Sequence, residues 1–353
     1  MRFPLLLATA LAATALHAWA GTPKQAADIR EAYDRDFQLW VLKLQVAKTS
    51  EERNQIATKR PDGAAAVQQM WNAIQPNLAE AWTIEPATWL LRTAASQAAR
   101  DPGLANVSKA VREAVEKHHL NSKSLAPLCM AMVAVNDANS LPLLEKIEKD
   151  CPDEKIQGVA ALGSAMLLKN FGDEPAIMRR RLNLLRKAII KSSEIEINGI
   201  SVAKLAEDEL YIIQFLGKGR EAPDLEGTDG SGQPLKLSDF KGKVVVLLFW
   251  RSQEGSTEQV MEMARLMRER FAGKPFEVVG VNRDPLATLG QMRASGQLTW
   301  PNFSDPENKL GAQYRVAAWP LAYVLDGNRQ VHYVGGVGSF VELTAAALLE
   351  DKK

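Results

Sequence analysis

The chain has 353 residues, of which 46% are hydrophobic, 43 are Lys or Arg and 42 are Asp or Glu, so its formal net charge is +1. This length is sufficient for two domains with ordinary hydrophobic cores. Because the charges balance, the composition lacks the basic excess that is typical of proteins that bind nucleic acid or anionic membranes, and we expect neither kind of partner.

Residues 1–20 have the features of a signal peptide. Arg2 precedes an apolar run over residues 4–16, and Ala18 and Ala20 form the small-x-small pattern of a cleavage site. The apolar run is too short for a stable membrane anchor. We therefore expect a mature chain that is exported, soluble and periplasmic or secreted. A buried N-terminal helix is the alternative interpretation.

Residues 21–216 predict an all-α domain. Apolar side chains recur at helical spacing, as at Tyr33, Phe37 and Trp40, and most of the predicted helices are bounded by Asp, Asn, Gly or Pro. Short helices joined by short loops are typical of helical-hairpin arrays, although no fixed repeat period is present. Such a domain either buries its own faces as a scaffold or presents a concave surface to a partner.

The only two cysteines, Cys129 and Cys151, fall in this helical half. Cys129 lies in a helix predicted over residues 125–135, and Cys151 follows a helix predicted over residues 141–148. Two antiparallel neighbours could bring the thiols within bridging distance, and the disulfide would stabilise the fold by roughly 3 kcal/mol. The alternative is a pair of buried free thiols.

The histidine pair His118-His119 does not predict a metal site. Adjacent residues on a helix point about 100° apart, and Glu116 would add at most one further ligand on the face of His119. We interpret the pair as a solvated helix end, and we expect no metal and no cofactor.

From residue 217 to residue 353 the pattern changes to alternating strands and helices. The run over residues 244–250 is apolar throughout, which is typical of a strand buried on both faces. The order of elements predicts an α/β sandwich with a mixed central sheet, and hence a two-domain α+β protein. The expected elements are a hairpin near residues 225–237, strands over 244–250 and 276–281, helices over 256–271 and 286–295, a hairpin over 323–334 and a helix over 341–349.

Three stretches of this second half share a family pattern. They are Ala222-Pro223-Asp224, the segment from Leu237 to Trp250, and the segment from Trp319 to Asp326. Together they resemble the redoxins, the thioredoxin-fold superfamily that includes AhpC/TSA-like peroxiredoxins and exported TlpA-type thiol–disulfide reductases. The resemblance covers roughly residues 217–345 and implies a thioredoxin fold.

The resemblance also places the redox site of the family on Glu254-Gly255-Ser256-Thr257. In TlpA-type proteins the two cysteines fall on Glu254 and Thr257, and in the peroxiredoxin register the reactive cysteine falls on Gly255. Because no cysteine occurs after Cys151, neither register retains the thiolate that the chemistry requires. We expect no catalytic residue at these positions.

The residues that replace this site predict a helix start. Ser256 and Gln259 have the spacing of a capping box, which would make the segment a stabilised helix end rather than a new site. A retained ligand groove is the alternative. The resemblance implies that Pro320 is cis and that the chain before it offers backbone hydrogen bonds to an extended peptide, with Trp250 and Trp319 as apolar walls. For Trp250, a position in the core is the alternative.

We therefore expect an exported thioredoxin-fold protein that is redox-inactive and acts as a protein- or peptide-binding or scaffold module for an unknown exported partner. The alternative is a thiol–disulfide oxidoreductase or peroxide-reducing enzyme that uses Cys129, Cys151 or a partner thiol.

Overall fold

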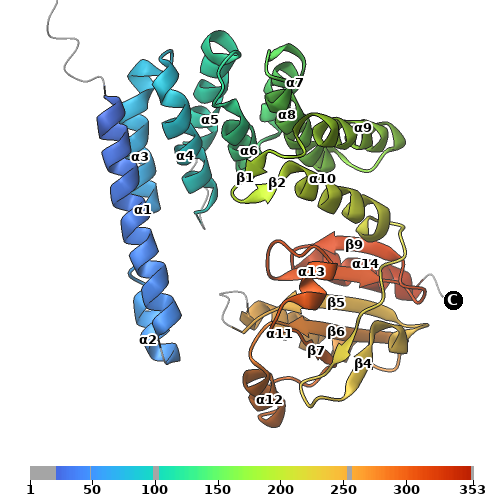
Figure 1. The fold of residues 1–353 in the computed structure, drawn as a ribbon. Coiled ribbons are helices and arrows are strands. Elements are labelled where there is room, and N and C mark those ends of the chain that lie inside the picture. Colours follow the sequence, from blue (N-terminus) through green and yellow to red (C-terminus); the bar gives the residue numbers. More distant parts are fainter. Residues whose placement is uncertain (1–20, 48, 98–102, 253–256, 351–353) are drawn as a thin grey trace, which may run out of the picture. The chain divides into compact units, whose positions relative to one another are not determined.

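The structure, a computed structural model, describes residues 21–47, 49–97, 103–252 and 257–350 (Figure 1). The chain forms two compact units, Met1–Ala206 and Glu207–Lys353. The first is helical and the second contains a mixed five-stranded sheet, which confirms the predicted fold class. The predicted signal peptide, residues 1–20, lies outside the described residues. No helix in the described ranges has both the length and the hydrophobicity needed to cross a bilayer.

In the helical unit, each helix packs mainly on helices close to it in the chain, such as α3 on α4 and α8 on both α7 and α9. This pattern of neighbour contacts is typical of a helical array. Its buried side chains are mostly aliphatic, and α8 is buried along nearly its whole length. The helices are α1 (Pro23–Val46), α2 (Ser50–Ala57), α3 (Gly63–Ile74), α4 (Ile84–Ala95), α5 (Leu104–Ala114), α6 (Leu125–Val135), α7 (Leu141–Asp150), α8 (Glu154–Leu168), α9 (Pro175–Ser192) and α10 (Val202–Tyr211), which continues into the second unit.

The helix boundaries follow from the capping residues in the sequence. The side chains of Thr22, Asp62 and Asp153 accept hydrogen bonds from backbone amides in the first turns of α1, α3 and α8. Asn136 ends α6 with a left-handed conformation, at a φ of 56°. These polar breakers separate the helices as the sequence predicts.

A small hairpin interrupts the helical unit. Strands β1 (Glu196–Ile197) and β2 (Ile200–Ser201) pair in antiparallel register around Asn198-Gly199. Both turn residues have positive φ, 54° and 78°, as an Asn-Gly hairpin turn requires. The prediction of an all-α domain is therefore incomplete at this point.

The two cysteines of the helical unit are buried free thiols. Cys129 lies on α6 and Cys151 directly follows α7, and their exposed fractions are 0% and 1%. The structure has no disulfide between them, contrary to the prediction and in agreement with its alternative. Burial raises the pKa of Cys129 to about 12, with the nearby charge of Cys151 as the second cause. Cys129 is therefore protonated at neutral pH and is a poor nucleophile.

One member of the histidine pair differs from its interpretation, since His119 is buried, whereas His118 is exposed near the helix end as predicted. His119 is only 5% exposed, and its Nε2 lies 2.7 Å from the carbonyl oxygen of Leu78. The ring therefore satisfies a buried backbone group instead of facing solvent at a helix end. Within the described ranges, no group of three or more His, Cys, Asp and Glu side chains could hold a metal ion.

The second unit is built on a five-stranded sheet of order β7-β6-β5-β8-β9. Its central strand β5 (Val244–Trp250) pairs in parallel with β6 (Phe276–Asn282) and antiparallel with β8 (Leu321–Leu325). All seven residues of β5 are buried, because both faces of the strand are covered. The other elements are β3 (Glu226–Thr228), β4 (Pro234–Lys236), α11 (Thr257–Arg270), α12 (Leu286–Ala294), β7 (Asn302–Ser304), α13 (Lys309–Gln313), β9 (Val331–Gly335) and α14 (Ser339–Glu350).

The two faces of β5 belong to two separate cores. Val246, Leu248 and Trp250 join one core with side chains of α11 and α14. Val245, Leu247 and Phe249 join the other. The predicted strand, its neighbours and the two hairpins are present, whereas β7 and α13 were not predicted. Both are short, and neither has the turn signal that marked the short strands of the two hairpins.

Alkylation of the two cysteines tests directly whether both are buried free thiols in the folded helical unit. In native protein without reductant, we expect neither thiol to react with iodoacetamide, because both are inaccessible and Cys129 stays protonated. In denaturant without reductant, we expect two additions by intact-mass analysis. No addition after denaturation would show that the two cysteines are joined by a disulfide.

Candidate functional site

The candidate site of the second unit lies at the edge of the sheet where β5 and β6 end and β8 begins. The register pairs Trp250 with Asn282 and Phe249 with Leu321. Because these residues are paired, three segments lie close together at this edge. They are the segment that follows Trp250, the segment that follows Asn282, and Trp319-Pro320, which precedes β8. We call this region the carboxyl edge.

Trp250 itself is a core residue. It is 1% exposed, and its indole Nε1 donates a hydrogen bond of 2.9 Å to Oδ1 of Asn302. Its ring lies in the same core as Trp300, with ring centroids 6.3 Å apart. A side chain buried to this degree cannot line an open groove, so the prediction that Trp250 is a groove wall is wrong.

A buried polar network holds the carboxyl edge in place. The Oδ2 atom of Asp284 accepts hydrogen bonds from the backbone amide of Ser252, at 2.8 Å, and from Nδ2 of Asn282, at 2.9 Å. Asn282 and Asp284 are 0% and 4% exposed. Buried polar groups are retained at low cost only when they are paired, and here the pairing holds the backbone at Ser252.

A second buried carboxylate fixes the neighbouring loop. Asp305 accepts hydrogen bonds from the backbone amides of Lys309 and Gly311, at 2.7 and 2.9 Å, and so anchors the start of α13. A side chain at Gly311 would lie 2.9 Å from Cζ2 of Trp319. The close approach of α13 to this ring therefore requires glycine at position 311.

Trp319 is the aromatic group that the carboxyl edge presents. It is half-buried, with an edge-to-face contact to Phe249 at 5.9 Å between ring centroids. Its other neighbour is Arg283, whose guanidinium carbon lies 5.5 Å from the ring centroid, within reach of a cation–π interaction. The bond between Trp319 and Pro320 is cis, as the resemblance implies.

The chain before Trp319 has free backbone groups. Ala317 and Ala318 are exposed, and among the described residues no backbone hydrogen bond is recorded for either. An extended peptide could pair with such groups as an added strand does. The carboxyl edge therefore combines an aromatic ring, a cation and open backbone groups.

The replaced redox positions are only partly described. Glu254, Gly255 and Ser256 lie outside the described residues, and so does the predicted capping bond of Ser256. Thr257 begins α11, and its Oγ1 donates a hydrogen bond of 3.2 Å to the carbonyl oxygen of Arg251. The sequence has no thiol in this unit, since both cysteines precede it.

Sequence reasoning missed the polar residues that support this edge. Asn282, Asp284, Asn302 and Asp305 are all 4% exposed or less. Their one visible signal in the sequence is their position at strand ends. Asn282 ends β6 and Asp284 lies two residues later, whereas Asn302 begins β7 and Asp305 directly follows it. Their pairing across strands is a tertiary property, and a motif search for catalytic residues does not detect it.

The role of Asp284 can be tested by stability. Asp284→Ala would leave the buried amide groups of Ser252 and Asn282 without an acceptor, and we expect the free energy of unfolding to fall by about 1–3 kcal/mol. Calorimetric unfolding of the full chain measures this loss. Glu350→Ala, which removes an exposed acid, is the control and should change stability little. Equal stability of both variants would contradict the supporting role.

Comparisons with known proteins match the second unit. Residues 218–334 match the model of the AhpC/TSA family. Peroxiredoxin Q, chloroplastic, of Oryza sativa subsp. japonica is 31% identical over 128 residues, which is 34% of this chain and 58% of that protein. Peroxiredoxin Bcp of Bacillus subtilis is 33% identical over 105 residues, 29% of this chain and 65% of that protein.

Similarity extends to thiol–disulfide oxidoreductases. ResA of Geobacillus kaustophilus is 27% identical over 117 residues, 33% of this chain and 67% of that protein. The solved thioredoxin domain of a thiol-disulfide oxidoreductase from Bacteroides vulgatus is 21% identical with a TM-score of 0.35, covering 38% of this chain and 98% of that structure. With its redoxin motifs and its sheet order, the second unit of this chain belongs to the thioredoxin-like redoxin superfamily.

Proposed function

We propose that this protein is a redox-inactive member of the superfamily that binds an extended segment of a partner protein at the carboxyl edge. The observation that carries the proposal is the absence of cysteine after Cys151 in the sequence. The redoxin unit thus keeps the fold of its relatives without the sulfur on which disulfide exchange and peroxide reduction depend.

The remaining thiols do not favour an enzyme. Cys129 and Cys151 are buried, and the pKa of Cys129 is raised to about 12 by burial. Reactive cysteines are partly exposed and have lowered pKa values. This argues against the alternative of a thiol–disulfide oxidoreductase or peroxide reductase that uses these residues.

The carboxyl edge supports binding by three kinds of contact. Trp319 offers a half-buried aromatic surface, and Arg283 places a positive charge beside it. Backbone groups of Ala317 and Ala318 are open to pairing with an extended chain. Aromatic and arginine side chains with open backbone groups are common anchors of peptide recognition.

The proposal also includes a place in the cell. Residues 1–20 have the pattern of an export signal, and we propose that the mature chain acts outside the cytoplasm on an exported partner. N-terminal sequencing of protein secreted or extracted from an expressing cell would show cleavage after Ala20 if the signal is used.

Binding at the carboxyl edge can be measured with carboxymethylated insulin B chain, an unfolded peptide without free thiols. We expect the full chain to bind it and Trp319→Ala to weaken binding about tenfold, by loss of the aromatic contact worth about 1 kcal/mol or more. Arg283→Ala should also weaken binding, because it removes the positive charge beside Trp319. Arg283 belongs to neither hydrophobic core, so we expect this variant to keep the core packing. Fluorescence anisotropy of a labelled B chain measures the dissociation constants.

The control for these variants is Phe340→Ala. Phe340 is an aromatic residue of the same unit, on α14, and is 68% exposed. Its removal should leave binding unchanged. Equal binding by wild type, Trp319→Ala and Arg283→Ala would remove the carboxyl edge from the proposal.

A further inference from the structure

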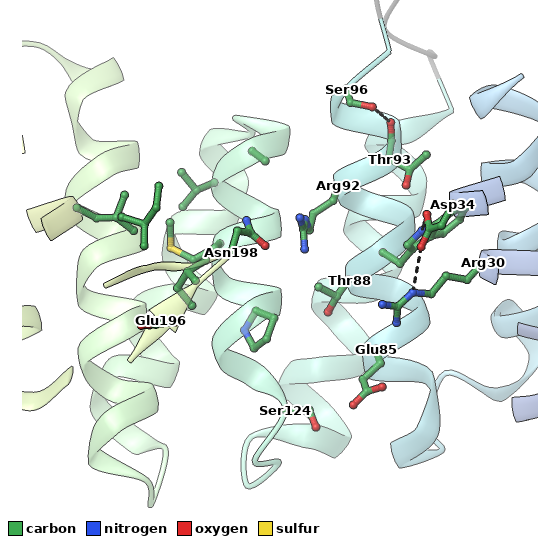
Figure 2. A pocket seen from close by; sticks show the side chains of 18 of the residues that line it. Arg30, Asp34, Glu85, Thr88, Arg92, Thr93, Ser96, Ser124, Glu196 and Asn198 are labelled. Carbon is green, nitrogen blue, oxygen red and sulfur yellow. Dashed lines mark hydrogen bonds and ion pairs between the residues drawn. The ribbon is translucent and has the colours of Figure 1, made fainter. Parts of the chain in front are cut away.

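The helical unit contains a cavity of its own, of about 1090 Å³ (Figure 2). One face each of α1, α4 and α6 forms most of its wall, and the β1–β2 hairpin adds a further part. The lining residues on each helix recur at steps of three and four, which places them on one side of that helix. They are Arg30, Tyr33, Asp34 and Phe37 on α1; Glu85, Thr88, Trp89, Arg92 and Thr93 on α4, with Ser96 directly after it; and Pro127, Met130, Val133 and Ala134 on α6.

The wall formed by α1 is held by contacts within the protein. Asp34 pairs with Arg30 at 3.4 Å and accepts a hydrogen bond of 2.9 Å from Nε1 of Trp89. The ring of Tyr33 meets that of Trp89 edge to face, with centroids 5.7 Å apart. These residues tie α1 to α4, so the acid and the base on α1 already have partners inside the protein.

Arg92 differs from these residues. It is exposed, it lies in the last turn of α4, and Figure 2 shows its side chain extending from α4 into the cavity on the side of Asn198. Among the described residues, no hydrogen bond or ion pair of its guanidinium group is recorded. A positive charge near the C-terminus of a helix is favoured by the helix dipole, which explains why a basic residue occurs at this position. The dipole does not explain why the Arg92 side chain points into the cavity.

The walls next to Arg92 are apolar. Met130 and Val133 on α6 are half-buried, and Ile200 of the hairpin is 46% exposed although it lines the cavity. An unpaired cation beside aliphatic side chains suits a ligand that carries a carboxylate next to apolar groups. Lys123 adds a further exposed cation to the lining, and Glu85 and Glu196 add two acids, so the cavity has mixed charge. A polyanion such as a nucleic acid is therefore disfavoured.

A second cavity of about 930 Å³ lies beside the first, and the two share Arg30, Asp34, Glu85 and Ser124 as lining residues. In the first cavity, the lining residues Glu85 and Arg92 of α4 are two helical turns, or about 10 Å, apart. Such a length fits an extended chain better than a compact small molecule.

We propose that this groove, defined by the lining residues above, binds an extended segment of a partner protein whose acidic side chain pairs with Arg92. Apolar side chains beside that carboxylate pack on α6 and on Ile200. This site belongs to the helical unit alone, and it does not depend on binding at the carboxyl edge.

A phage-displayed library of random dodecapeptides, selected on the full chain, tests the proposal. We expect enriched peptides with an acidic residue beside aliphatic residues, and we expect Arg92→Glu to weaken binding of the synthesised peptide at least tenfold. A peptide in which Lys replaces the acidic residue should regain affinity for Arg92→Glu. Ile200→Asp should also weaken binding of the original peptide.

Two matched variants serve as controls. Arg186→Glu reverses an exposed arginine on α9, and Ile190→Asp changes an isoleucine on α9 that is 82% exposed; neither residue lines the cavity. Both should bind the peptide as wild type does, and so should Trp319→Ala, which alters only the carboxyl edge.

Three results would overturn the proposal. They are a selection without enriched acidic peptides, equal binding by wild type and Arg92→Glu, and loss of binding in Trp319→Ala. The last would assign the selected peptides to the carboxyl edge and leave the groove without a ligand. Unchanged far-UV circular dichroism of each variant confirms that a loss of binding is not a loss of folding.

Discussion

The redoxin unit depends on one constraint, a central strand buried on both faces. Each residue of β5 enters one of two cores, and the paired neighbours β6 and β8 fix where the strand ends. This burial supplies most of the favourable free energy of folding, and it comes from the side chains of β5 and its neighbours. The chemistry of the loop can therefore change while the fold stays the same, and this chain fits that expectation.

Much of this architecture follows from the sequence, because long apolar runs and capping residues act locally. The orientation of Trp250 does not, since a run without polar residues gives no indication of which side chains face which core. Its partner Asn302 lies on another strand, so the bond between them is a property of the folded chain. The Asn-Gly sequence at residues 198–199 is a typical signal for a hairpin turn. The two strands beside it have only two residues each, which is too short to show an alternation of apolar and polar side chains. Neither the carboxylates of the carboxyl edge nor the cavity beside Arg92 has a sequence motif.

The two units present surfaces of different chemistry. At the carboxyl edge, Trp319, Arg283 and open backbone groups suit an extended chain of varied sequence. In the groove of the helical unit, Arg92 has no ion-pair partner within the described part of the chain and lies beside aliphatic residues, which suits a more specific anionic and apolar segment. A protein with both surfaces is consistent with a binding role in which the redoxin fold serves as a rigid support, and thiol chemistry is not needed for either surface.

We propose that this redoxin unit has lost thiol chemistry only because its sulfur atoms are missing. The most direct measurement is reduction of insulin by dithiothreitol with wild-type protein and with Glu254→Cys/Thr257→Cys, which restores cysteines where the family resemblance places them. The account predicts the uncatalysed rate for wild type and a faster rate for the double variant. A wild-type rate above the uncatalysed one would contradict the account, and its loss in Cys129→Ala or Cys151→Ala would show that the buried thiols catalyse the reaction.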